Sequence, residues 1–218
     1  MTMSKPDGAP SKSVGARIVG NNLGRAAITV AVFVAALWAI EGVDTVLGNS
    51  LDHWGIEPRE GGGLRGIAMA PLLHGGWSHL AANTVPALVL GFVGLAAGAG
   101  RFILATAVIW VFSGVGVWLT GADNTVVVGL SGVLFGWTTY LVLRGLFTRR
   151  PLDLIVGLVL AVIYGGMLWG VLPGQAGVSW QAHLWGAVGG VLAAILLGRR
   201  RGGRSRSVDS RQVGAIAS

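Results

Sequence analysis

The sequence contains no cysteine and few charged residues. The lack of cysteine excludes disulfides, thiolate metal sites and a cysteine nucleophile. Charged residues are only 11% of the 218 residues, whereas hydrophobic residues are 53%, and the mean hydropathy is +0.69. Soluble globular domains carry about 25% charged residues. The composition therefore indicates a membrane protein.

Long stretches without charge mark the expected membrane crossings. These stretches are residues 66–100, 102–122, 124–143 and 154–198. The second and third each fit the about 20 apolar residues that one crossing needs, and the fourth fits two helices joined at Pro173-Gly174. The first is interpreted as a loop leading into a helix, and an additional helix is expected from about Ala26 to Val46. The prediction is an all-α, polytopic membrane protein: a bundle of six transmembrane helices.

Three segments are expected along the chain. Residues 1–22 are rich in Ser, Lys, Pro and Gly and too polar for a secretory signal peptide, so they are predicted to be a disordered cytoplasmic tail. Residues 23–198 form the predicted six-helix membrane domain. Residues 199–218 form a basic cytoplasmic tail.

The basic residues fall almost entirely on one side of the predicted helices. Of the 16 Lys and Arg residues, all but Arg59 and Arg65 lie in the tails or in connections on the side of the termini. This distribution predicts that both termini are cytoplasmic and that the protein lies in the plasma membrane. The net charge of +7 is therefore interpreted as a means of orientation and of contact with membrane lipids, and no nucleic-acid binding is expected.

Four polar residues are expected at one depth below the outer surface. Ser131 lies about five residues past the expected helix boundary near Val126, which is ~7 Å at the helical rise. His183 has a similar depth in the last helix, and Asn83 follows His79 by one turn on the same helix face. Polar side chains are costly inside a bilayer and are functional candidates by default.

These residue types suit acyl transfer. A serine hydroxyl becomes a strong nucleophile when a neutral imidazole takes its proton, and no acidic residue is placed to complete a triad. We therefore expect a Ser131–His183 dyad. The oxyanion formed by the attack requires fixed hydrogen-bond donors. The candidates are the Ser131 backbone N–H, the Asn83 amide and the His79 ring.

Each residue alone also has an ordinary structural explanation. Ser131 can bond a carbonyl four residues back or permit close helix packing. His183 can be an interhelical hydrogen-bond partner, and His74 can tie down its own loop. The shared depth of several such residues favours catalysis. Gly129 and Gly132, which flank Ser131, would let the chain bend and let a substrate backbone approach.

Three motifs resemble those of rhomboid intramembrane serine proteases of the bacterial six-helix form. GLSG at 129–132 resembles the family's GxSG and makes Ser131 the counterpart of the nucleophile. HGGWSHLAAN at 74–83 has the HxxxxHxxxN spacing. The resemblance implies that His79 and Asn83 support the oxyanion and that His74 is structural.

The third motif is AHLWGAVGG at 182–190. It makes His183 the counterpart of the catalytic base, and Gly186 and Gly190 the glycines that pack the last helix against the serine helix. Phe135, one turn after Ser131, corresponds to an aromatic ring that the family keeps against the histidine.

Some positions depart from the family pattern. Leu64-Arg65 only partly matches a Trp-Arg pair in the first outer loop, and Met69 stands where a threonine is common. Residues 94–99 lack the acidic residue often found near the end of the second helix.

The resemblance implies a serine endopeptidase that cleaves transmembrane protein substrates near the outer membrane face, without cofactor or metal. A substrate helix is expected to enter beside the fifth helix. One alternative is a non-catalytic rhomboid-like protein that binds transmembrane clients. Another is a transporter, which would typically show mid-membrane carboxylates or an internal repeat. A metal site through His74, His79 and His183 is a third, but no further ligand completes it.

Overall fold

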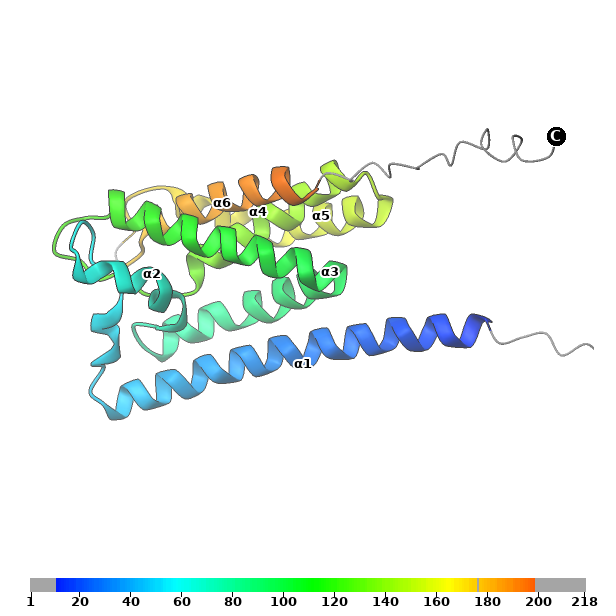
Figure 1. The fold of residues 1–218 in the computed structure, drawn as a ribbon. Coiled ribbons are helices and arrows are strands. Elements are labelled where there is room, and N and C mark those ends of the chain that lie inside the picture. The colour runs from blue at the N-terminus through cyan, green and yellow to red at the C-terminus, as the bar shows by residue number, and fades with distance from the viewer. Residues whose placement is uncertain (1–10, 176, 199–218) are drawn as a thin grey trace, which may run out of the picture.

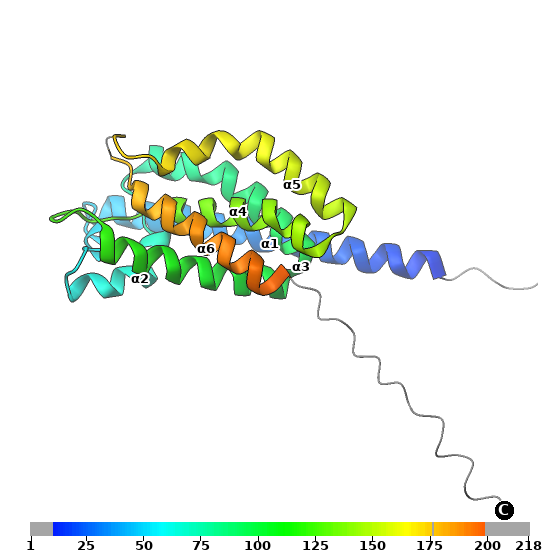
Figure 2. The same cartoon turned by 90° about the horizontal axis from the view of Figure 1, so that it is seen from above.

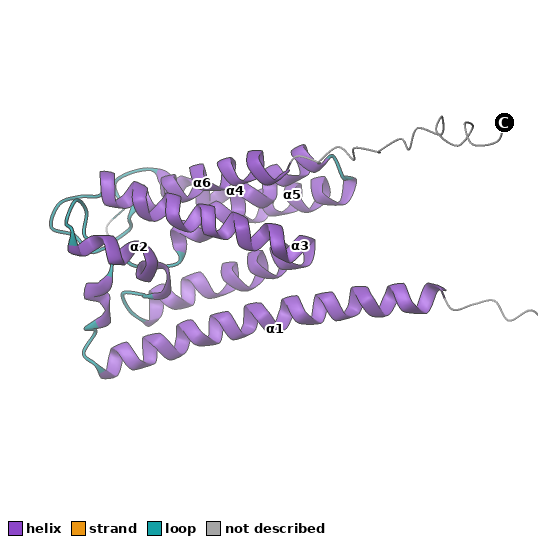
Figure 3. Ribbon diagram, in the orientation of Figure 1, coloured by secondary structure: helices purple, strands orange, loops and turns teal. Residues whose placement is uncertain are grey.

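The computed structural model describes residues 11–175 and 177–198, which form a bundle of helices (Figures 1 and 3). The α-helices are α1 (Ser11–Val46), α2 (Gly66–Met69), α3 (Trp77–Thr120), α4 (Ser131–Thr148), α5 (Pro151–Tyr164) and α6 (Trp180–Gly198). Short 3-10 helices span Leu51–Trp54, Gly62–Arg65, Ala70–Leu72 and Gly165–Val171. Within the described residues the only β-type pairing is an isolated bridge between Ile56 and Val127.

α3 is a helical hairpin with two arms. Gly98 has non-helical dihedral angles of φ 150° and ψ 92°, and the chain reverses there. The two arms then run side by side (Figure 1). A Cβ at Gly94 would overlap the Phe102 ring, so glycine lets the arms close on each other. These arms are the two helices that the sequence placed on either side of Arg101.

Three of the helices are long and apolar enough to cross a membrane. They are Gly20–Val46, Trp77–Thr120 and Trp180–Leu197. α4 and α5 are shorter, with 18 and 14 residues. The all-helical, membrane-type fold is confirmed, whereas six crossings and the orientation of the termini stay predictions.

α4 is the centre of the bundle. Twelve of its 18 residues are buried. It contacts both arms of α3, α5 and α6, and lies between α5 and α6 when the bundle is viewed from above (Figure 2). α5 is peripheral, since only Gly157, Leu160 and Tyr164 of its 14 residues are buried. The sequence does not distinguish a central α4 from a peripheral α5, because both helices are strongly apolar.

The first helix is longer than the sequence suggests. α1 begins at Ser11 and not near Ala26, so residues 11–22, expected in the tail, are helical. No proline lies between residues 11 and 46, so nothing in the chain forces an earlier break. The remaining tail residues, 1–10 and 199–218, lie outside the described part of the chain.

α4 begins at Ser131 and not near Val126 as expected. Residues before it are held in an extended loop, because Val127 pairs with Ile56 and the Gly129 N–H donates to the Ala70 carbonyl at 2.8 Å. Gly129 has φ +119°, a conformation that L-residues rarely adopt, and this turns the chain into the helix. Ser131 is therefore the first residue of α4.

The two ends of the bundle differ in composition. The start of α1, the turn of α3 and the α4–α5 connection point to one end (Figure 1), which we call the basic end. Its basic residues in the described part of the chain are Lys12, Arg17, Arg25, Arg101, Arg144, Arg149 and Arg150. The opposite end, which we call the loop end, is formed by the connecting segments at 47–76, 121–130, 172–175 and 177–179.

Candidate active site

Ser131 and His183 form a hydrogen-bonded pair at the loop end. The distance between Ser131 Oγ and His183 Nε2 is 2.9 Å. Ser131 starts α4, and His183 lies in the first turn of α6. The His183 side chain is buried, with 8% of its surface exposed. The two first turns thus meet at one level, although their residues are 52 positions apart in the sequence.

A backbone carbonyl fixes the protonation of the histidine. His183 Nδ1 lies 2.9 Å from the carbonyl oxygen of Gly170, in the 3-10 helix that follows α5. A carbonyl only accepts, so Nδ1 carries the proton in the neutral ring. Nε2 is then the acceptor, and the Ser131 hydroxyl donates to it. This is the arrangement that a general base requires.

Two neighbours hold the imidazole plane in place. The Phe135 ring stacks on His183 with centroids 4.0 Å apart and an interplanar angle of 8°. A Cβ at Gly170 would lie 2.9 Å from Phe135 Cζ and 3.1 Å from His183 Nδ1. A side chain at residue 170 would therefore crowd both rings.

α4 and α6 are in backbone contact through glycines. A Cβ at Gly186 would overlap the Gly132 carbonyl, and one at Gly190 would overlap the Gly136 carbonyl. Small residues of this kind let membrane helices approach closely. The pairing sets the distance between the helices that carry Ser131 and His183.

A second hydroxyl lies close to the pair without joining it. Ser113, on the second arm of α3, donates from Oγ to the Ala182 carbonyl at 3.0 Å. A Cβ at Gly132 would come within 2.9 Å of the same carbonyl. Ser113 thus fastens the first turn of α6 beside the site.

Of the other predicted residues, His79 lies against Gly129 and His74 contacts His79. The rings of His74 and His79 meet edge to face, with centroids 5.1 Å apart. A Cβ at Gly129 would lie 2.5 Å from His79 Cε1, so the imidazole rests on the glycine two residues before Ser131. Asn83 is buried, and its Nδ2 has no hydrogen-bond partner among the described residues.

His74 is the most enclosed of the three histidines. It is 1% exposed, and within the described residues neither ring nitrogen has a hydrogen-bond partner. Burial, and then the neighbouring His79, lower the pKa of His74 from 6.5 to about 4. His74 is therefore neutral at physiological pH and packs as an uncharged ring against His79.

A pocket of about 490 Å³ opens between the loops above this region. It is lined by His79 and by residues of the loops at 121–128 and 177–179, with Gln181 at its edge. In residues 11–175 and 177–198, no group of three or more His, Asp or Glu side chains is arranged to hold a metal ion.

Sequence reasoning missed two of the groups at the site. The Gly170 carbonyl is a backbone atom in a glycine-rich stretch, GGMLWG, and the glycines were the only available signal. Ser113 lies in the middle of an apolar helix, where a serine is indistinguishable from a packing residue.

The rhomboid domain family model matches residues 62–200, more than half of the chain. The chain belongs to the rhomboid family. It is 49% identical over 177 residues to an uncharacterized protein of Mycobacterium tuberculosis and to one of Mycobacterium bovis, covering 78% of this chain and 74% of each relative. An uncharacterized protein of Mycobacterium leprae is 46% identical over 178 residues, covering 78% of this chain and 70% of the relative.

Family membership confirms the resemblance drawn from the three motifs. Rhomboid proteins are in general intramembrane serine proteases, and some rhomboid-like proteins are inactive. The names of the mycobacterial relatives state no activity. This rhomboid protein is a membrane protein. Family membership alone does not establish that it is catalytically active.

Proposed function

We propose that this rhomboid protein is an intramembrane serine endopeptidase that cuts transmembrane protein substrates with a Ser131–His183 dyad. One observation carries the proposal: the 2.9 Å bond between Ser131 Oγ and His183 Nε2, with Nδ1 held as a donor by Gly170. A serine that only packs does not need a histidine whose acceptor nitrogen faces its hydroxyl.

The first half-reaction forms an acyl-enzyme. Ser131 Oγ attacks the scissile carbonyl while its proton passes to His183 Nε2. The imidazolium that forms keeps its Nδ1 bond to the Gly170 carbonyl, which stabilises the positive charge without a buried carboxylate. The C–N bond then breaks, and Nε2 returns the proton to the leaving amine.

Three donors are available for the oxyanion. The N–H of Ser131 is at the first position of α4, where helical N–H groups have no intrahelical partner. The Asn83 amide has an unpaired Nδ2, and His79 lies against Gly129 beside the serine. Donors fixed before the reaction stabilise the developing charge more than mobile water does.

Water completes the cycle by hydrolysing the acyl-enzyme, again with His183 as base. The pocket beside His79 offers a route from the loop end. The substrate helix is proposed to enter beside α5, because that helix is largely exposed. A helical substrate must unwind locally, since its carbonyls are otherwise engaged in its own hydrogen bonds.

The direct test is cleavage of a model single-span protein reconstituted with the purified enzyme. The wild type should release two fragments, and Ser131→Ala and His183→Ala should each lower the rate at least about a thousandfold. Ser50→Ala and His53→Ala are matched controls, because both side chains are exposed on the first loop, away from the pair. Cleavage unaffected by the first two changes would reject the dyad.

The proposed orientation has a separate test. The native chain lacks cysteine, so a single introduced thiol can be labelled without background. Asn124→Cys probes the loop end, and Arg150→Cys probes the basic end. A membrane-impermeant maleimide applied to intact cells should label the first and spare the second. The reverse pattern would put the active site on the cytoplasmic side.

A further inference from the structure

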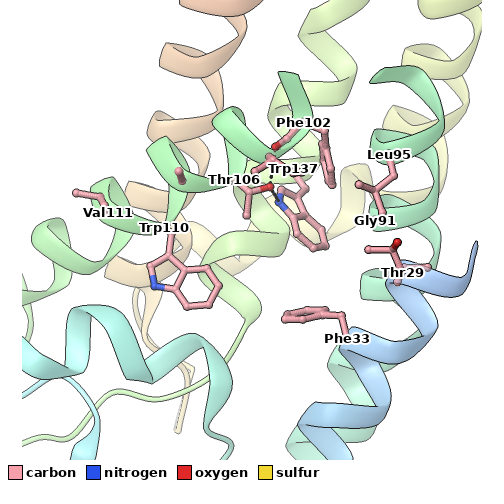
Figure 4. A pocket seen from close by; sticks show the side chains of 12 residues that line it. Thr29, Phe33, Gly91, Leu95, Phe102, Thr106, Trp110, Val111 and Trp137 are labelled. Carbon is pink, nitrogen blue, oxygen red and sulfur yellow. Dashed lines mark hydrogen bonds between the residues drawn. The ribbon is translucent and has the colours of Figure 1, made fainter. Parts of the chain in front are cut away.

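A groove lies between α1 and the second arm of α3, on the side of the bundle away from α5. Its volume is about 510 Å³, within the roughly 300–1,000 Å³ of small-molecule sites. α1 and the first arm of α3 form one wall, the second arm of α3 forms the other, and Trp137 of α4 lies between them (Figure 4). The Ser131–His183 pair is not part of the lining.

Aromatic rings give the groove an apolar interior. Phe33, Phe102 and the indoles of Trp110 and Trp137 line it (Figure 4). Trp137 Nε1 donates to Thr106 Oγ1 at 2.9 Å, and Trp110 donates to a backbone carbonyl at 2.9 Å. The polar N–H groups are thus satisfied within the protein, and the ring hydrocarbons are left to contact the occupant.

Two arginines lie at the end of the groove nearest the basic end. Thr29 on α1 and Leu95 on α3 both line the groove. Arg25 lies one turn before Thr29 on the same helix face, about 6 Å nearer the basic end. Leu95 is followed within one turn by the reversal at Gly98, and the second arm then starts beside Arg101. Both arginine side chains are exposed.

Neither arginine has an acidic partner in the described part of the chain. The ion pairs there are Arg59 with Asp123 and Arg144 with Asp153. No acidic residue lines the groove. An apolar slot at membrane depth that ends at two uncompensated cations matches the chemistry of a lipid with hydrocarbon chains and an anionic headgroup.

We propose that the groove is a binding site for one anionic phospholipid. An acyl chain lies in the slot against the rings of Phe33, Phe102 and Trp137, and the phosphate is bound by Arg25 and Arg101. The groove volume is on the scale of one long acyl chain. The bound lipid would fill the space between α1 and the second arm of α3.

Native mass spectrometry of the purified full-length protein tests the headgroup part. Palmitoyl-oleoyl phosphatidylglycerol and the zwitterionic phosphatidylcholine are titrated separately, and the retained lipid is counted. The wild type should bind phosphatidylglycerol preferentially. Arg25→Gln with Arg101→Gln should weaken this binding about thirtyfold. Arg149→Gln with Arg150→Gln removes the same charge away from the groove and should leave it unchanged.

Filling the slot tests the hydrocarbon part. Ala107→Phe and Thr29→Phe each place a ring into the groove from an exposed lining position, and each should abolish lipid retention. Val162→Phe, on the exposed face of α5, is the matched control and should retain lipid. Circular dichroism and size-exclusion profiles identify any variant that fails to fold, and the two filling variants serve as independent replicates.

Three outcomes would overturn the proposal. The two lipids could be retained equally by the wild type, so that the headgroup is not recognised. The arginine variants could lose lipid while both filling variants keep it, which would indicate binding at the surface only. The wild type could appear as a dimer that Ala107→Phe dissociates, in which case the groove holds a second copy of the chain. None of these readouts depends on proteolysis.

Discussion

The two ends of the bundle satisfy their buried polar groups in different ways. At the active site, His183 is buried between a serine hydroxyl and the Gly170 carbonyl, and His74 is buried without charge. The buried carboxylate of Asp44, also at the loop end, accepts from the Leu51 N–H at 2.7 Å. At the basic end, the buried Arg144 forms an ion pair with Asp153. The neutral imidazole of His183 suits proton transfer, whereas the ion pair serves as an anchor.

The anchor joins three helices. Arg144 on α4 donates to the Ala97 carbonyl at the α3 turn, at 2.8 Å, and lies 3.6 Å from Asp153 Oδ2 on α5. Thr148 donates to the same carboxylate at 2.8 Å. α5 is thus fastened at the basic end by a charged contact, whereas its buried residues further along, Gly157, Leu160 and Tyr164, pack without charge.

The largest expected effect is at the α4–α6 backbone contact. Gly186→Leu would drive a side chain into the Gly132 carbonyl and separate Ser131 from His183. We expect a loss of at least about 4 kcal/mol of stability and no detectable proteolysis. Thermal unfolding in detergent and the reporter cleavage measure both quantities.

Gly166→Leu is the matched control, because nothing lies within 4 Å of a Cβ at that position. It should leave unfolding and cleavage close to the wild type. Equal damage by the two changes would show that the glycine contact is not what fixes the distance between α4 and α6.

A smaller effect is expected from the anchor at the basic end. Asp153→Ala leaves Arg144 buried without its partner and should cost about 3–5 kcal/mol. Asp123→Ala breaks the exposed pair with Arg59 at the loop end and should cost under about 1 kcal/mol. The midpoints of thermal unfolding show which of the two variants loses more stability. A larger loss from Asp123→Ala would reverse the contrast between the two ends.

The next effect depends on pH and reports the uncharged state of the buried His74 ring. His74 has a pKa of about 4 in the folded protein against 6.5 when unfolded. As the pH falls, the unfolded chain therefore takes up a proton on His74 before the folded protein does. The contribution of His74 to the stability of the folded protein is complete above pH 6.5 and falls as the pH drops toward 4. The loss should reach about 3 kcal/mol.

His74→Phe should remove this part of the pH dependence, as measured by thermal unfolding between pH 7 and 4. His53→Ala, in the exposed part of the first loop, should keep it. An unchanged slope in His74→Phe would mean that His74 is not the buried neutral group responsible.

The smallest predicted effect concerns the ring that stacks on His183. Phe135→Leu removes an aromatic contact of about 0.5–1.5 kcal/mol and should lower turnover up to about tenfold. Phe112→Leu disrupts a comparable ring contact, with Trp185, centroids 6.0 Å apart and away from the pair. Steady-state cleavage rates compare them. A larger effect from Phe112→Leu would contradict the role of the stack.

Much of the loop end could be predicted from the sequence. Ser131, His183 and the spacing from His74 to Asn83 stand out because polar groups in charge-free stretches are rare. The one-sided distribution of Lys and Arg predicts the orientation of the helices, and the orientation gives each polar residue an expected depth in the membrane. The packing role of Gly186 and Gly190 came from the resemblance to the rhomboid motif, and their one-turn spacing puts both on one helix face.

Other features depend on tertiary structure and have no local signal. The Gly170 carbonyl becomes a partner of His183 only because the chain after α5 tightens into a 3-10 helix. The start of α4 at Ser131 depends on the pairing of Val127 with Ile56, 71 residues apart in the sequence. The pair of Arg144 with Asp153 requires the fold to bring α4 and α5 together.

The most direct test of the central claim is labelling of Ser131 by a fluorophosphonate probe, with the modified residue mapped by peptide mass spectrometry. The account predicts that the wild type and Ser113→Ala are labelled at Ser131, that His183→Ala is labelled far more slowly, and that Ser131→Ala is not labelled. Folded wild-type protein that leaves Ser131 unmodified, or labelling that persists in Ser131→Ala, would contradict an activated serine at this position.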